Sequence, residues 1–164
     1  MTEVHPFIAY LETLRNDRAA LAALRRGLGH PPGTVASMYP YVVPWLPRHG
    51  HPRHVAAYYT VAALFAYHPK DGGEGNMGDH LARTRRRGEE DLAVERRFTA
   101  LLAAHVDDLG FYLRQAIGFL RSKEVPVNWG QLLADILAWN HPHRRVQQQW
   151  ARSFWGSMPP AGKR

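Results

Sequence analysis

Apolar residues recur at helical spacing through most of this 164-residue chain. The first stripe predicts a helix at about residues 6–15, and an alanine- and leucine-rich segment predicts a second at residues 18–26, with Asp17 as a suitable cap. Residues 55–67 are apolar nearly all round and predict a buried central helix, which Pro52 can open at its first turn.

Further helical stripes follow in the second half of the chain. They predict a short helix at Asp79–Arg83 and four further helices, which begin at about Glu89, Leu109, Asn128 and Pro142. Six prolines between residues 30 and 52 restrict that segment to short turns. No alternating strand pattern and no hairpin signal is found. The expected fold class is therefore all-α, a two-lobed helical bundle of about seven to eight helices.

The segment HPKDGGEGNMG, residues 68–78, holds four glycines and one proline, which is typical of a loop. It marks the expected boundary between an N-terminal helical lobe, residues 1–75, and a C-terminal helical lobe, residues 76–164. The first lobe carries 7 basic and 5 acidic side chains, a net charge of +2, and the second carries 14 basic and 9 acidic side chains, a net charge of +5. Most of the basic excess therefore belongs to the C-terminal lobe.

The formal net charge of +7 and the isoelectric point of about 10.1 favour an anionic partner, either nucleic acid or a membrane surface. No apolar run approaches the ~20 residues of a membrane span, and the first residues lack the features of a signal peptide. We therefore expect a cytoplasmic protein without a membrane partner. The chain has no cysteine, which excludes disulfides, cysteine-ligated zinc and thiol catalysis.

Basic residues are densest over residues 81–123, where apolar residues recur beneath them at helical spacing. Arg114 and Arg121 are seven residues apart, so they share one flank of their predicted helix. Gly110 and Gly118 lie towards that flank and would leave room for a nucleic-acid backbone. A helix pair with a buried face and a basic outer face suits binding to a phosphate backbone.

Some of these charges also suit structural roles. Arg25 and Arg26 end a predicted helix, where cations complement the helix dipole. Some arginines could instead form salt bridges between subunits. The acidic residues from Glu89 to Glu95 suit the start of a helix better than acid–base catalysis, so we do not expect an enzyme.

Histidines raise the possibility of a metal site. His49, His51 and His54 lie close together, and His141 and His143 form a second pair. A structural zinc site needs four ligands and a catalytic one needs three, and no carboxylate falls at a suitable spacing. Exposed loop histidines are therefore favoured, and neither a metal nor a cofactor is expected.

The last two predicted helices offer an alternative function. They could form a helix-turn-helix regulator of DNA, with Arg144, Arg145 and residues 147–149 at the start of a recognition helix. The turn between them is longer than usual for that motif and contains proline, which favours an ordinary helical hairpin.

Taken in order, a set of short motifs resembles the CasB family, the small subunit of the type I-E CRISPR surveillance complex called Cascade. The resemblance covers nearly the whole chain and depends on the order and spacing of the motifs. These are Arg25-Arg26-Gly27, the tyrosine-rich turn Met38–Trp45, Pro52-Arg53-His54, Gly78–Leu81, Glu95-Arg96-Arg97-Phe98 with Leu101-Leu102, Leu113-Arg114-Gln115, Val125–Trp129 with Gln131-Leu132-Leu133, and Trp150-Ala151 with Phe154-Trp155.

The resemblance implies a helical protein without enzymatic activity. Two copies would pack head to tail beside other Cascade subunits. A basic face would hold the hybrid of guide RNA (crRNA) and target DNA, and the displaced strand of the R-loop, independently of sequence because guide pairing supplies specificity. The residues that match basic positions of the family, and so would bind nucleic acid, are Arg25, Arg26, Arg53, Arg83, Arg96, Arg97, Arg114 and Arg121. The basic run Arg85, Arg86 and Arg87 is additional to the family positions, and we include it among the expected contacts.

Overall fold

A computed structural model describes residues 5–85 and 91–156 of the protein. Within these residues the all-α expectation is confirmed, because nine α-helices are joined by loops that contain one isolated bridge, between Asp71 and Val127. The helices are α1 (Pro6–Thr13), α2 (Arg18–Arg25), α3 (Tyr39–Val42), α4 (Pro52–Tyr67), α5 (Met77–Ala82), α6 (Leu92–Ala103), α7 (Leu109–Ser122), α8 (Trp129–Leu137) and α9 (Arg145–Trp155). Short 3-10 helices span Ala36–Met38, Val43–Trp45 and Val106–Asp108.

Most helices lie where the apolar periodicity predicts them. The additional helix is α3, a single turn in the proline-rich segment. The last helix begins at Arg145 and not at Pro142, because Arg144 adopts a left-handed conformation with φ of 51°. None of the helices in the described part of the chain combines the length and the apolar character that crossing a membrane requires.

Side-chain caps fix several helix starts. Asp17 at α2 and Asn128 at α8 each accept a hydrogen bond, 3.0 Å long, from the backbone N–H three residues on. At α5, Asn76 and Asp79 form a capping box, in which each side chain accepts from the backbone N–H of the other residue, at 3.2 and 2.9 Å. These bonds satisfy N–H groups that have no partner within the helix.

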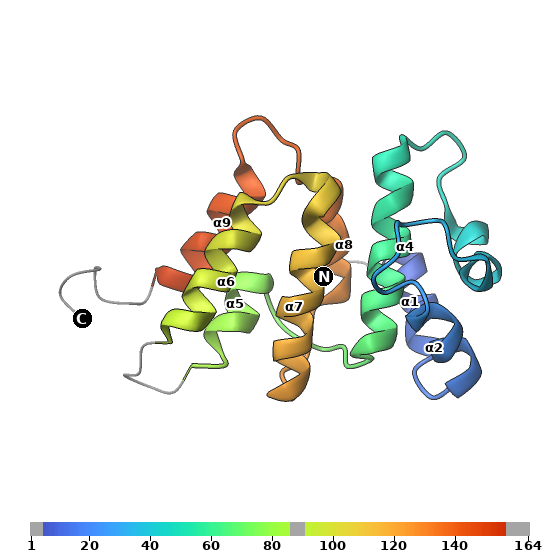
Figure 1. The fold of residues 1–164 in the computed structure, drawn as a ribbon, viewed down its shortest axis with the longest axis horizontal. Coiled ribbons are helices and arrows are strands. Elements are labelled where there is room, and N and C mark those ends of the chain that lie inside the picture. Colours follow the sequence, from blue (N-terminus) through green and yellow to red (C-terminus); the bar gives the residue numbers. More distant parts are fainter. Residues whose placement is uncertain (1–4, 86–90, 157–164) are drawn as a thin grey trace.

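The helices fall into two groups with α7 and α8 between them (Figure 1). Helices α1, α2 and α4 lie on one side, and α4 contacts α2, α7 and α8. On the other side α5 packs against α9 and α6 packs against α7. Helices α7 and α8 belong to the expected C-terminal lobe, yet both pack directly on α4 of the expected N-terminal lobe.

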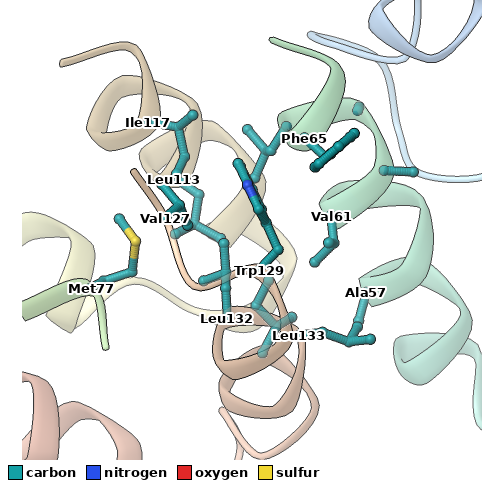
Figure 2. Packing of buried hydrophobic residues seen from close by; sticks show 14 of the residues in the cluster. Ala57, Val61, Phe65, Met77, Leu113, Ile117, Val127, Trp129, Leu132 and Leu133 are labelled. Atoms are coloured by element: carbon teal, nitrogen blue, oxygen red, sulfur yellow. The ribbon is translucent and has the colours of Figure 1, made fainter. Parts of the chain in front are cut away.

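The fully buried Trp129 of α8 lies at the centre of this packing (Figure 2). Its ring meets the edge of Phe65 from α4, with the ring centroids 5.7 Å apart, and Val61 of α4 lies close by. Leu113 and Ile117 of α7 are fully buried on the other side of the indole. One continuous apolar cluster therefore crosses the expected lobe boundary, and the division at residue 75 stays a prediction.

The loop that the sequence marks as a boundary is tied to a second loop, which joins α7 to α8. We call these two paired segments, residues 68–73 and 124–129, the seam. The Nε2–H of the buried His68 donates to the carbonyl of Val125 at 2.7 Å, and the Lys70 ammonium donates to the carbonyl of Glu124 at 3.0 Å. The N–H of Val127 donates to the Lys70 carbonyl at 3.0 Å.

A carboxyl pair joins α1 to the same seam. Protonated Glu12 donates a hydrogen bond to the Asp71 carboxyl; this bond, with partial burial and the charge of Asp71, raises the pKa of Glu12 from 4.5 to about 7. The folded protein therefore keeps a proton that the unfolded chain releases. The stability from this pair is complete below about pH 4.5 and is lost as pH rises through about 7.

We expect Glu12→Gln to remove this pH dependence, because the amide keeps a hydrogen-bond donor but does not titrate. The variant should match the wild-type protein in thermal stability at pH 5 and exceed it at pH 8, as measured by circular dichroism. Glu74→Gln is the matched control, because Glu74 lies exposed on the neighbouring stretch of the same loop. Equal pH profiles for the wild-type and Glu12→Gln proteins would contradict the carboxyl pair.

Candidate nucleic-acid interface

Eight of the arginines predicted to bind nucleic acid are exposed in the structure, and none has a carboxylate oxygen within 4.0 Å of its side-chain nitrogens among the described residues. They are Arg25, Arg26, Arg53, Arg83, Arg96, Arg97, Arg114 and Arg121. Their charges are therefore available to an external anion. Arg86 and Arg87 lie outside the described residues.

Arg53 and Arg114 both line a cavity of about 570 Å³. Its walls are the loop of residues 27–33, one face of α4 and the start of α7. The loop bends at Gly29, where φ is +80°, and a Cβ built on Gly29 would lie 3.1 Å from Nη1 of Arg114. The bare backbone of this glycine therefore lets the guanidinium lie against the loop.

Arg25 and Arg26 lie beside the same loop. Arg25 ends α2, and Arg26 is its C-cap residue, directly before the cavity wall. Both are exposed. Their positions suit the helix dipole as well as an external phosphate, and one guanidinium can serve both at once.

Arg121 continues the flank of α7 that carries Arg114. Its guanidinium lies over the Tyr67 ring, 5.1 Å from the centroid. A Cβ built on Gly118 would lie 3.0 Å from the Tyr67 hydroxyl, and one built on Gly110 would contact Thr60 at 3.8 Å. The expectation that these glycines leave room for nucleic acid is wrong at Gly118, because Tyr67 of α4 fills that space.

Arg96 and Arg97 project from α6 into solvent, opposite and beside its buried face, as the periodicity predicts. Arg97 lines a small hollow between α6 and α7 together with Tyr112 and Gln115. The structure thus carries exposed arginines on both helices that pack against each other in this half of the protein.

Arg85 differs from the other described arginines. It is half-buried, its guanidinium lies 4.2 Å from the centroid of the Phe154 ring, and it donates to the Phe154 carbonyl at 2.7 Å. These contacts attach the end of α5 to α9. Arg85 therefore has a structural position, and its contact with nucleic acid stays a prediction.

Arg83 is held by a loop carbonyl and lies beside a buried histidine. It donates to the carbonyl of Glu74 at 2.6 Å, and its Nη1 lies 3.0 Å from Nδ1 of His80. Nε2 of His80 accepts a hydrogen bond from the N–H of Asn128 at 3.0 Å. Burial, followed by the charge of Arg83, lowers the pKa of His80 to about 4.

Histidines that precede a proline cap two helices, at His5 and His51, and His141 makes the same bond in the turn before α9. Nδ1 of His5, His51 and His141 each accepts a hydrogen bond from the backbone N–H two residues on, at 3.1 to 3.2 Å, and a proline stands between in every case. Sequence reasoning missed this role, although the repeated His-Pro dipeptide was its signal. Among the described residues, no three side chains of His, Asp or Glu lie close enough to share a metal ion.

The last two helices are joined by a longer connection than a helix-turn-helix has. Residues 138–144 connect them, which exceeds the three- to four-residue turn of a helix-turn-helix. The Arg144 side chain donates to the Leu102 carbonyl and so is engaged within the protein. Helix α9 packs against α5 and buries Val146, Trp150 and Phe154.

A further residue of interest is Phe111, which no sequence motif singled out. It lines the cavity and is 64% exposed, which is unusual for a phenylalanine. The sequence could have indicated its exposure, because Phe111 lies on α7 outside the buried stripe of Leu109, Leu113 and Ile117. An exposed aromatic ring beside two arginines is a surface on which a base can stack.

Both the sequence and the fold of this chain are similar to those of known proteins. The family model described as CRISPR-associated protein Cse2 matches residues 20–155. A curated protein of Thermus thermophilus with the same description is 38% identical over 156 residues, which cover 92% of this chain and 89% of the relative.

Two solved structures illustrate the structural similarity. CasB from Thermus thermophilus has a TM-score of 0.82 and 34% sequence identity, with 96% of this chain and 100% of that chain covered. A chain of a CRISPR RNA-guided surveillance complex has a TM-score of 0.79 and 29% identity, with 90% of this chain and 88% of that chain covered.

We expect the buried His80 to make the protein sensitive to acid. Because its pKa is lower in the folded protein than in the unfolded chain, the stability it supports is complete above about pH 6.5 and is lost as pH falls towards about 4. In His80→Gln the side-chain oxygen can still accept from Asn128 without titrating. The wild-type protein should lose up to roughly 3 kcal/mol more than this variant between pH 6.5 and pH 4, measured by urea unfolding. Parallel losses in the two proteins would refute this role of His80.

Proposed function

The chain belongs to the CRISPR-associated Cse2 family, and we propose that it is a non-catalytic subunit of a CRISPR RNA-guided surveillance complex that binds nucleic acid through exposed arginines. In this role it holds the hybrid of guide RNA and target DNA, together with the displaced strand of the R-loop. It lies beside the other subunits of the complex, with a second copy of itself head to tail.

The observation that carries this proposal is the set of eight exposed arginines without a carboxylate partner among the described residues. Guanidinium groups bind phosphate oxygens in pairs of hydrogen bonds, and an unpaired guanidinium needs no internal ion pair to be broken first. Contacts of this kind carry no sequence information, which suits a subunit whose complex finds its target by base pairing.

The positions of the acidic residues support a role without catalysis. Asp91 caps α6 by accepting hydrogen bonds from two backbone N–H groups, and Glu95 accepts from the indole N–H of Trp155 at 3.1 Å. The buried Asp135 accepts from the indole of Trp150 at 2.7 Å and from the amide of Gln131 at 2.9 Å. Each of these carboxylates has a local structural task.

We expect the double variant Arg53→Ala with Arg114→Ala to weaken binding of mixed-sequence single-stranded DNA and RNA to a similar extent. Two lost phosphate contacts should make the negative slope of log affinity against log salt shallower by about 1.4, since each contact on a single strand contributes roughly −0.7. Fluorescence anisotropy across a salt series measures both quantities, and circular dichroism checks the fold.

The matched control is Arg145→Ala with Arg152→Ala, which removes the same charge from the exposed face of α9. The proposal predicts that the cavity pair changes the slope more than the α9 pair does. A helix-turn-helix regulator predicts the reverse, together with a strong preference for one duplex sequence that is lost on changing Gln148. An unchanged slope in the cavity variant would overturn the arginine assignment.

A further inference from the structure

The cavity beside Arg53 and Arg114 has an apolar interior. Its deeper wall is formed by Met38, Ala57 and Leu64, which are all buried. Exposed residues of the 27–33 loop and of α4 form its edge, so the interior is reachable from solvent. Its volume of about 570 Å³ falls within the ~300–1,000 Å³ range of pockets that hold small organic groups.

The charges around this cavity are arranged unevenly. Arg53 and Arg114 stand on α4 and on the second turn of α7, whereas Asp107 and Asp108 stand where the chain enters α7. Two carboxylates in the lining oppose the entry of a phosphate group. They can accept hydrogen bonds from the amino groups of nucleobases, as carboxylates do from cytosine N4. Asp107 and Asp108 are exposed, as Arg53 and Arg114 are, so all four charged groups lie at the edge of an apolar interior. Such an interior fits a base whose phosphates remain outside.

Two aromatic residues border the same space. The exposed Phe111 lies on the first turn of α7, and the mostly buried Tyr59 of α4 faces the backbone of Gly33, with ring atoms 3.5 Å from the position of a built Cβ. Stacking on aromatic rings tolerates any base, so it is compatible with binding that does not depend on sequence.

We propose that this cavity binds one unstacked base of a single-stranded nucleic acid. Arg53 and Arg114 contact the phosphates that flank the base, and Phe111 provides the ring on which the base stacks at the edge. The inference rests on the proposed function, because it requires a strand held at these arginines. It adds a site for a base to a surface that otherwise binds only phosphates.

The test uses the full-length protein and two oligonucleotides of equal length and charge, one of mixed sequence and one made entirely of abasic sugar-phosphate units. Ala56→Leu narrows the cavity from α4 without changing charge, at a partly buried position where leucine is a good helix former. Phe111→Ala removes the ring at the edge. Leu92→Ala is the control, because Leu92 is exposed but does not line the cavity.

We expect the wild-type protein to bind the mixed-sequence strand about tenfold more tightly than the abasic strand, which is the scale of one stacked base. Ala56→Leu and Phe111→Ala should each reduce this ratio severalfold and leave affinity for the abasic strand unchanged. Leu92→Ala should behave as the wild-type protein does. Matched DNA and RNA strands show which single strand supplies the base.

Four results would overturn the inference. A wild-type ratio near one means that no base is bound, although salt-dependent binding of both strands would leave the proposed function intact. A tenfold ratio that persists in both cavity variants places the base elsewhere. Binding of a free mononucleotide as tight as that of the strand means that the cavity is a site for nucleotides alone. If neither strand binds even at low salt, the proposed function fails together with the inference.

Discussion

The hydrogen bonds of the seam, between residues 68–73 and 124–129, hold α7 and α8 against α4, and the rest of the structure depends on this contact. Neither loop has regular secondary structure of its own, and buried backbone groups need partners, which each loop supplies to the other. The seam positions Trp129 at the start of α8, where it packs against α4, and it brings α7 alongside α4. The cavity lies where these two helices and the 27–33 loop come together, so the site depends on contacts made at the C-terminal end of α4.

Glycine has a specific part in the seam. A Cβ on Gly73 would lie 2.5 Å from the Pro126 carbonyl oxygen, closer than any side chain tolerates. The same loop also contributes Asp71, whose carboxyl bonds to Glu12 of α1. The glycine-rich composition that predicts a loop in the sequence thus also allows two backbones to approach closely.

The helices could be predicted from the sequence because their apolar periodicity and their caps are local. Asp17 and Asn128 act within three residues of their own positions, and both cap their helices as expected. The exposed positions of Arg96 and Arg97 follow from the same periodicity. The position of Arg85 could not be predicted, because its partner Phe154 is 69 residues away and arginine at a helix end suits solvent equally well. The cavity could not be predicted either, since its walls come from segments that are far apart in the sequence.

The histidine caps have a chemical consequence at the nucleic-acid face. Because Nδ1 of His51 accepts a hydrogen bond from the N–H of Arg53, the neutral ring carries its hydrogen on Nε2. The ring therefore presents an uncharged donor next to a guanidinium. A neutral donor displaces no condensed counterions when it meets a phosphate oxygen. Under the proposed function, the variation of affinity with salt therefore reports the guanidinium contacts and not a hydrogen bond from this imidazole.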